Sequence, residues 1–117
     1  MVAPDGAAVR PLLGLSGGTI AEFELAPGQV SAAVTHRTVD EIWYVLRGRG
    51  EIWRRQGTHE EVAPLEPGVC LTIPVGTHFQ FRALADGTLT VLGITMPPWP
   101  GAADEATPVA GPWTPTV

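Results

Sequence analysis

The sequence contains no lysine and a single cysteine, and both features limit what the chain can do. All seven basic residues are arginine, and 12 acidic residues leave a net charge of −5. This acidic balance predicts no nucleic-acid partner, because the phosphate backbone needs an excess of positive charge. The lone Cys70 cannot form an intrachain disulfide, so the cysteine content does not indicate secretion. Its place in the apolar stretch VCLTI predicts a buried side chain.

Long apolar runs are also missing. No stretch approaches the roughly 18 apolar residues that a membrane-spanning helix needs, so we expect no membrane partner. The opening stretch MVAPDGAAVRP lacks the charged and apolar regions of a signal peptide, and none is predicted. A cytoplasmic location follows from these observations as an expectation.

What the sequence does have is a regular series of turn signals between short β-type stretches. Glycine and proline residues separate stretches such as TIAEFEL, EIWYVLR and TLTVLGIT. Short strands at a spacing of about ten residues are typical of an all-β sandwich or barrel. The chain has 117 residues and is 44% hydrophobic, which is enough for a single domain with its own core. We expect residues 1–95 to form that domain.

The stretch from residue 41 to residue 47 shows a useful alternation. Glu41, Trp43 and Val45 share one face of the predicted strand, because side chains in a strand alternate between its two faces. The residues between them are also mostly apolar. We therefore predict that this strand is buried on both faces.

The tail, residues 96–117, differs in composition from the rest of the chain. It contains six of the 12 prolines, which remove backbone hydrogen-bond donors and exclude a central strand. It also contains Trp99 and Trp113, whose large apolar rings favour burial. We expect an extended, proline-rich arm that packs on the barrel or on a partner subunit, with a disordered tail as the alternative.

Two polar residues stand out in the stretch GQVSAAVTHRTVDEIWYVLRGRG. His36 and Glu41 lie on either side of a predicted turn, so their side chains can meet on adjacent strands. An imidazole and a carboxylate together could ligate a divalent metal, or could act as an acid–base pair. They could also be structural residues at the end of a strand.

The spacing around this pair resembles the first motif of the cupin superfamily. That motif runs from a glycine through two histidines and a glutamate to a second glycine, and this frame fits here from Gly28 to Gly48 without a gap. The second motif, a glycine followed by Pro-x-Gly and a histidine, is matched from Gly68 through residues 74–76. The resemblance implies a double-stranded β-helix, or jelly-roll, cupin barrel.

The departures from the family pattern fall on its metal ligands. The resemblance implies that two histidines of the first motif, the glutamate and the histidine of the second motif would hold an ion. His36 and Glu41 carry over, but Val34 occupies the first histidine position and Phe79 the last. His78 lies one residue early, and it could replace the missing ligand only if it precedes the strand or lies at a bulge.

Three functions remain open at this stage. The favoured one is a cupin that binds a small organic molecule in an apolar cavity, with acid–base chemistry of an isomerase or cyclase type at His36 and Glu41. The second is a metal-dependent dioxygenase, isomerase or lyase, with the ion held by His36, Glu41 and His78. The third is a non-catalytic scaffold or sensor. The expected ligand-binding residues are Val34, Trp43, Phe79, Gln80 and Phe81.

The same reasoning sets the expected cofactors and partners. The resemblance implies either no cofactor or one divalent transition metal, namely Fe, Mn, Ni or Zn. A small-molecule ligand is expected in the barrel. Similar small cupins form homodimers, and exposed apolar residues would find burial in a second copy, so we expect a homodimer.

Overall fold

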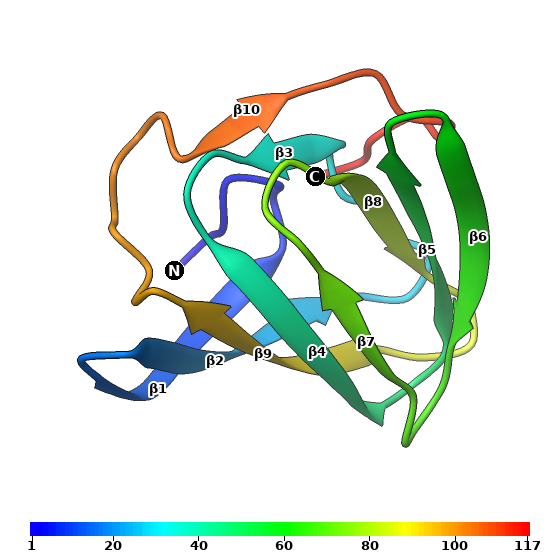
Figure 1. Ribbon diagram of the computed structural model, residues 1–117. Coiled ribbons are helices and arrows are strands. Elements are labelled where there is room, and N and C mark those ends of the chain that lie inside the picture. The colour runs from blue at the N-terminus through cyan, green and yellow to red at the C-terminus, as the bar shows by residue number, and fades with distance from the viewer.

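The computed structural model describes residues 1–117 and contains ten β-strands and no helix (Figure 1). No helix that could cross a membrane is therefore present. The strands form two five-stranded antiparallel sheets, ordered β1-β2-β9-β4-β7 in the first sheet and β10-β3-β8-β5-β6 in the second. This arrangement confirms the predicted all-β double-stranded β-helix. The strands are β1 (Ala8–Leu15), β2 (Gly18–Leu25), β3 (Val34–His36), β4 (Asp40–Arg47), β5 (Gly50–Gln56), β6 (His59–Leu65), β7 (Cys70–Ile73), β8 (His78–Ala83), β9 (Leu89–Met96) and β10 (Ala106–Pro108).

The core lies between the two sheets and is centred on aromatic rings. Trp43 of β4 is only 2% exposed. Its ring meets those of Phe79 and Phe81 edge-on, with ring centres 5.9 Å and 4.8 Å apart. Edge-on contacts of this kind add stabilisation beyond the apolar area that the rings bury. The strand alternation predicted for residues 41–47 is thus correct for the inner face of β4.

The outer face of β4 differs from the prediction. Tyr44 is 45% exposed, and Ile42 and Leu46 are only half-buried. The chain forms two layers, and no third layer covers the outside of the first sheet. The prediction of burial on both faces is therefore wrong, because apolar composition alone does not supply a covering element.

Cys70 also departs from its predicted environment. It begins β7 and is exposed, whereas Leu71 and Ile73 are buried. Thr72 is exposed like Cys70, so the strand alternates strictly between its two faces. The apolar stretch correctly predicted a strand, but the register of that strand turns the thiol outward.

Glycines fix the turns that the two motifs require. Gly48, between β4 and β5, has φ +82, and a Cβ atom there would overlap the carbonyl oxygen of Thr88. Gly76 has φ +85 in the turn that leads into β8. Glycine adopts this left-handed backbone without the steric cost that other residues incur, which explains the spacing that the sequence shows.

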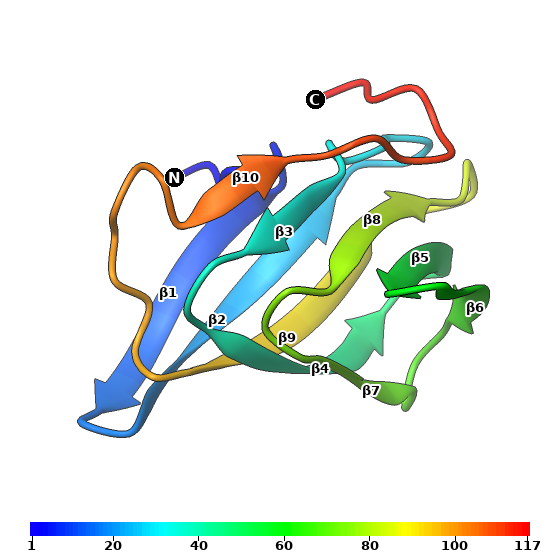
Figure 2. The same ribbon diagram turned by 45° about the horizontal axis from the view of Figure 1, so that its top comes forward.

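The segment after β9 lies along the second sheet. β10 pairs with β3 at the edge of that sheet, with Ala106 opposite His36 (Figure 2). Farther along, the backbone N–H of Trp113 donates to Gln80 Oε1 at 3.1 Å. The Arg82 guanidinium lies 4.1 Å from the centre of the Trp113 ring, within the range of a cation–π contact. These contacts hold the segment against the outer face of β8.

The N-terminal segment, residues 1–7, folds back before β1 begins. The N–H of Val9 donates to the carbonyl of Met1 at 2.8 Å, and the N–H of Ala32 donates to the carbonyl of Asp5 at 2.8 Å. The first contact closes the segment on its own strand, and the second ties it to the stretch before β3. The segment therefore lies beside β1 and the stretch before β3, with Asp5 and Ala7 buried and Met1 and Val2 exposed.

Candidate functional site

A cavity of about 340 Å³ lies between the N-terminal segment and the inner face of the first sheet. Residues of β1, β2, β4 and β9 line it on one side, and β3 and β8 contribute from the second sheet. Its wall is mainly apolar and includes the rings of Phe23, Trp43, Phe79 and Trp99. A volume of this size accommodates a small organic molecule.

His36 and Glu41 meet in the wall of this cavity. His36 ends β3 and Glu41 follows the start of β4, so the turn between the strands brings them together. His36 Nδ1 lies 2.8 Å from Glu41 Oε2, and the two residues are 8% and 3% exposed. The pair predicted from the sequence is therefore assembled, away from bulk solvent, and both residues line the cavity.

The imidazole of His36 lies between the Glu41 carboxylate and two aromatic rings. Although Nδ1 is close to Glu41, it has no hydrogen bond of correct geometry and is a buried polar atom without a partner. The rings of Phe79 and Trp99 pack edge-on against the imidazole, with ring centres 5.3 Å and 5.4 Å away. Because Nδ1 faces Glu41 Oε2 at 2.8 Å, the ring nitrogen left for a ligand is Nε2.

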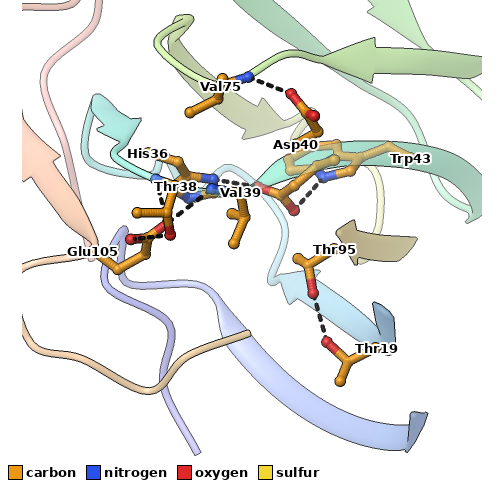
Figure 3. A network of polar contacts seen from close by, with 10 residues as sticks. Thr19, His36, Thr38, Val39, Asp40, Trp43, Val75, Thr95 and Glu105 are labelled. Atoms are coloured by element: carbon orange, nitrogen blue, oxygen red, sulfur yellow. Dashed lines mark hydrogen bonds and ion pairs between the residues drawn. The ribbon is translucent and has the colours of Figure 1, made fainter. Parts of the chain in front are cut away.

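The Glu41 carboxylate is held from a second direction. The indole Nε1–H of Trp43, two residues along β4 on the same face, donates to Glu41 Oε1 at 3.0 Å (Figure 3). The two carboxylate oxygens therefore have separate partners, the indole on one side and the imidazole on the other. This arrangement fixes the orientation of the carboxylate in an apolar wall.

Glu105, which the sequence analysis missed, holds the turn between the pair. Its buried carboxylate accepts hydrogen bonds from the N–H of Thr38 at 2.9 Å, the hydroxyl of Thr38 at 2.8 Å and the N–H of Val39 at 3.0 Å (Figure 3). Burial would raise the pKa of Glu105, but these hydrogen bonds outweigh burial and hold it below its ordinary value. No local sequence signal links Glu105 to Thr38, because they are far apart in the chain.

Asp5, also missed from the sequence, lies at the same cavity. It is 8% exposed, and its Oδ1 accepts a hydrogen bond from the N–H of Ala7 at 3.1 Å. Burial raises the pKa of the Asp5 carboxyl to about 6, the Ala7 hydrogen bond opposes this rise, and the nearby Glu41 carboxylate adds to it. The cavity therefore carries two carboxyl groups, one of which titrates near neutrality.

The other residues predicted to contact a ligand do not all line the cavity. Val34, Trp43 and Phe79 line the cavity as expected. Phe81 points to the inside of the barrel but is buried in the core and does not line the cavity.

Gln80 requires a correction. It lies between Phe79 and Phe81 in β8, so it points to the opposite face of the sheet. Its side-chain nitrogen donates to the carbonyls of Ser31 and Trp113, each at 2.8 Å. Its amide is therefore committed to holding the segment after β10, and Gln80 is not a contact of a ligand in this cavity.

The structure does not bring His78 to the pair. His78 already belongs to β8 and pairs with Thr35, whereas Phe79 pairs with Val34. Thr35 and His78 therefore face away from His36, and neither a loop nor a bulge turns the imidazole inward. No group of three histidine, cysteine, aspartate or glutamate side chains is arranged to hold a metal ion. The donor set therefore does not fit the ion that the family resemblance implies.

Comparison with known proteins agrees with this geometry. Residues 21–95 match the family described as "Cupin domain". No curated protein matched the chain.

Solved structures show the same fold. A cupin-2 domain protein from Rhodospirillum rubrum is 25% identical with a TM-score of 0.72, over 89% of this chain and 66% of that one. An RmlC-like cupin from Desulfovibrio desulfuricans is 26% identical with a TM-score of 0.64, over 80% and 84%. KdgF from a Halomonas species is 22% identical with a TM-score of 0.70, over 83% of each chain.

Proposed function

Because this chain belongs to the cupin domain family, we propose that it uses the interior of the barrel to bind a small organic molecule and to move a proton on it. One observation carries the proposal: the contact of 2.8 Å between His36 Nδ1 and Glu41 Oε2 lies in the wall of an apolar cavity of about 340 Å³. A buried imidazole–carboxylate pair at such a cavity suits general acid–base chemistry.

Each residue of the pair has a defined role in this proposal. Nδ1 of His36 faces Glu41, so the other ring nitrogen, Nε2, takes the proton from the ligand. Glu41 orients the imidazole and stabilises its positive charge once it is protonated. Trp43 is a positioning residue, since its indole N–H fixes the carboxylate. The apolar wall excludes water and strengthens these electrostatic interactions.

Proton exchange on a simple carbon acid tests this function. Phenylacetone is a neutral ketone of suitable size, and its acidic C–H positions exchange with deuterated water when a base removes a proton. The protein should accelerate this exchange, which NMR measures, and His36→Ala should lose about a hundredfold or more of the acceleration. Glu41→Gln should lose less, because the imidazole remains in place.

His59→Ala is the matched control, because His59 is exposed at the start of β6 and far from the cavity lining. It should retain the wild-type exchange rate. Exchange that is equal in the His36→Ala and His59→Ala proteins would instead support a non-catalytic scaffold or sensor. A transition metal at about one ion per purified chain would support the metal-dependent alternative.

We also propose that two copies of the chain associate through the β1–β2 hairpin. The hairpin projects beyond the body of the barrel (Figure 1) and carries Leu13 and Leu15, which are 82% and 86% exposed. A shallow groove beside it is lined by the same leucines together with Ile20, Ile94 and Met96. Because projection and groove are both apolar and adjacent, a two-fold axis could place each hairpin in the groove of the other copy.

Changing both leucines to serine should convert the dimer into a monomer, as measured by size-exclusion chromatography with light scattering. Val62→Ser is the control, because Val62 is 51% exposed but lies on β6 of the other sheet. A wild-type protein that is monomeric at high concentration, or a dimer that survives the leucine changes, would contradict this interface.

A further inference from the structure

The cavity is lined by more acidic than basic side chains. Asp5, His36 and Glu41 line it, and none of the seven arginines does. With Glu41 ionised, these three side chains together carry a negative or zero charge, whichever protonation states Asp5 and His36 adopt. The other positive group is the α-amino group of Met1, which also lines the cavity but is 81% exposed. An anionic ligand would therefore meet carboxylates without a positive side chain beyond His36 to compensate them.

Aromatic rings form much of the remaining wall. The ring of Phe79 contacts both Trp43 and the His36 imidazole, and Trp99 packs against the same imidazole. Phe23 stacks near Trp43, with ring centres 6.0 Å apart. Ring faces carry partial negative charge and attract organic cations, most strongly where water is excluded. Trp43 and Phe79 are only 2% and 1% exposed, so the ring surface open to a ligand comes mainly from the half-buried Phe23 and Trp99.

The Asp5 carboxyl completes this environment from the N-terminal segment. Its only side-chain hydrogen bond within the protein is the one that Oδ1 accepts from Ala7. Oδ2 therefore has acceptor capacity that no protein group uses. A ligand N–H group could satisfy it, whereas a ligand carboxylate or phosphate could not.

Resting on the proposed function, we infer that the ligand of this cavity is a small organic cation, an ammonium group attached to an apolar body. The ammonium group lies towards the Asp5 and Glu41 carboxylates, and the apolar body packs on the aromatic wall. Neutral molecules of the same shape bind more weakly, because they forgo the attraction to the carboxylates. Carboxylates and phosphates are rejected.

A series of probes that differ only in the charge of one group tests this inference. Phenethylammonium, phenethyl alcohol and phenylacetate share a phenyl ring and a short chain, and they carry positive, zero and negative charge. Isothermal titration calorimetry above pH 6 should show phenethylammonium binding about tenfold or more tightly than the alcohol. Phenylacetate should bind more weakly than both.

Variants assign the preference to the cavity. Asp5→Asn keeps the size of the side chain and removes one negative charge, so it should weaken phenethylammonium binding about tenfold and leave the alcohol within about twofold. Asp86→Asn makes the same change in the exposed turn between β8 and β9, and it should alter neither affinity.

The outcomes separate this inference from the proposed function. If the alcohol binds but phenethylammonium has no advantage, the charge preference is overturned and the cavity remains a binding site. The same conclusion follows if Asp5→Asn and Asp86→Asn have equal effects. If none of the three probes binds, the proposed function itself fails and the inference with it.

Discussion

Replacing Asp5 by asparagine is expected to stabilise the protein by about 3 kcal/mol at pH values well above 6. Burial raises the pKa of this carboxyl from 3.8 to about 6, and each pKa unit corresponds to about 1.4 kcal/mol. The wild-type protein bears the cost of an ionised, buried carboxylate at neutral pH. Asparagine carries no charge, and its side-chain oxygen can still accept the hydrogen bond from Ala7.

The stability difference between Asp5→Asn and the wild-type protein should depend on pH. Between pH 3.8 and about 6 the folded wild-type protein holds a proton that the unfolded chain has released, so its stability falls as the pH rises through this interval. The difference between Asp5→Asn and wild type should therefore vanish below pH 3.8 and reach its full value above about 6. Urea unfolding at several pH values measures it, with Asp86→Asn as the control. A constant difference at all pH values would contradict the explanation.

Glu105→Ala is expected to destabilise the protein by about 1–3 kcal/mol. The change removes a fully buried carboxylate that accepts hydrogen bonds from the N–H groups of Thr38 and Val39 and from the hydroxyl of Thr38. The N–H of Val39 would remain buried without an acceptor, which costs roughly 1–3 kcal/mol, whereas Thr38 is exposed and its donors can bind water instead. The turn that places His36 beside Glu41 would also loosen, so probe binding should weaken.

Asp104→Ala is the matched control for this variant, because the neighbouring Asp104 side chain is 76% exposed and forms only a long ion pair with Arg37. Chemical unfolding at neutral pH should separate the two variants by about 1–3 kcal/mol. The lowered pKa of Glu105 means that its contribution is present above pH 4.5 and is lost as the pH falls through the folded-state pKa. Equal stability of the Glu105→Ala and Asp104→Ala proteins would contradict the anchoring role.

The spacing of the turns predicted an all-β chain, and the resemblance of its two motifs to the cupin superfamily implied the barrel that the structure shows. Motif spacing identified His36 and Glu41, and strand alternation placed Trp43 and Phe79 on the inner face of the barrel. Strand alternation also predicted that His78 would point away from the cavity if it already belonged to the strand. In the structure His78 is the first residue of β8 and pairs with Thr35.

Asp5 and Glu105 were not predicted because their positions depend on contacts between distant parts of the chain. Asp5 reaches the cavity because the N-terminal segment pairs with Ala32, and Glu105 reaches the turn because β10 pairs with β3. A period of two along one strand carries no information about either contact. The same limit explains Gln80, whose amide partner Trp113 comes from the far end of the chain.

The pairing of β10 with β3 also has a consequence for the order in which the protein can mature during synthesis. The turn between His36 and Glu41 leaves the ribosome early, but the residue that clamps it, Glu105, is translated only after every strand of the barrel body. Such distant pairings slow folding, because chain entropy is lost before the contact is gained. A chain cut at residue 100 would therefore hold the pair loosely, and the imidazole and the carboxylate would acquire their final geometry only once Glu105 has been added.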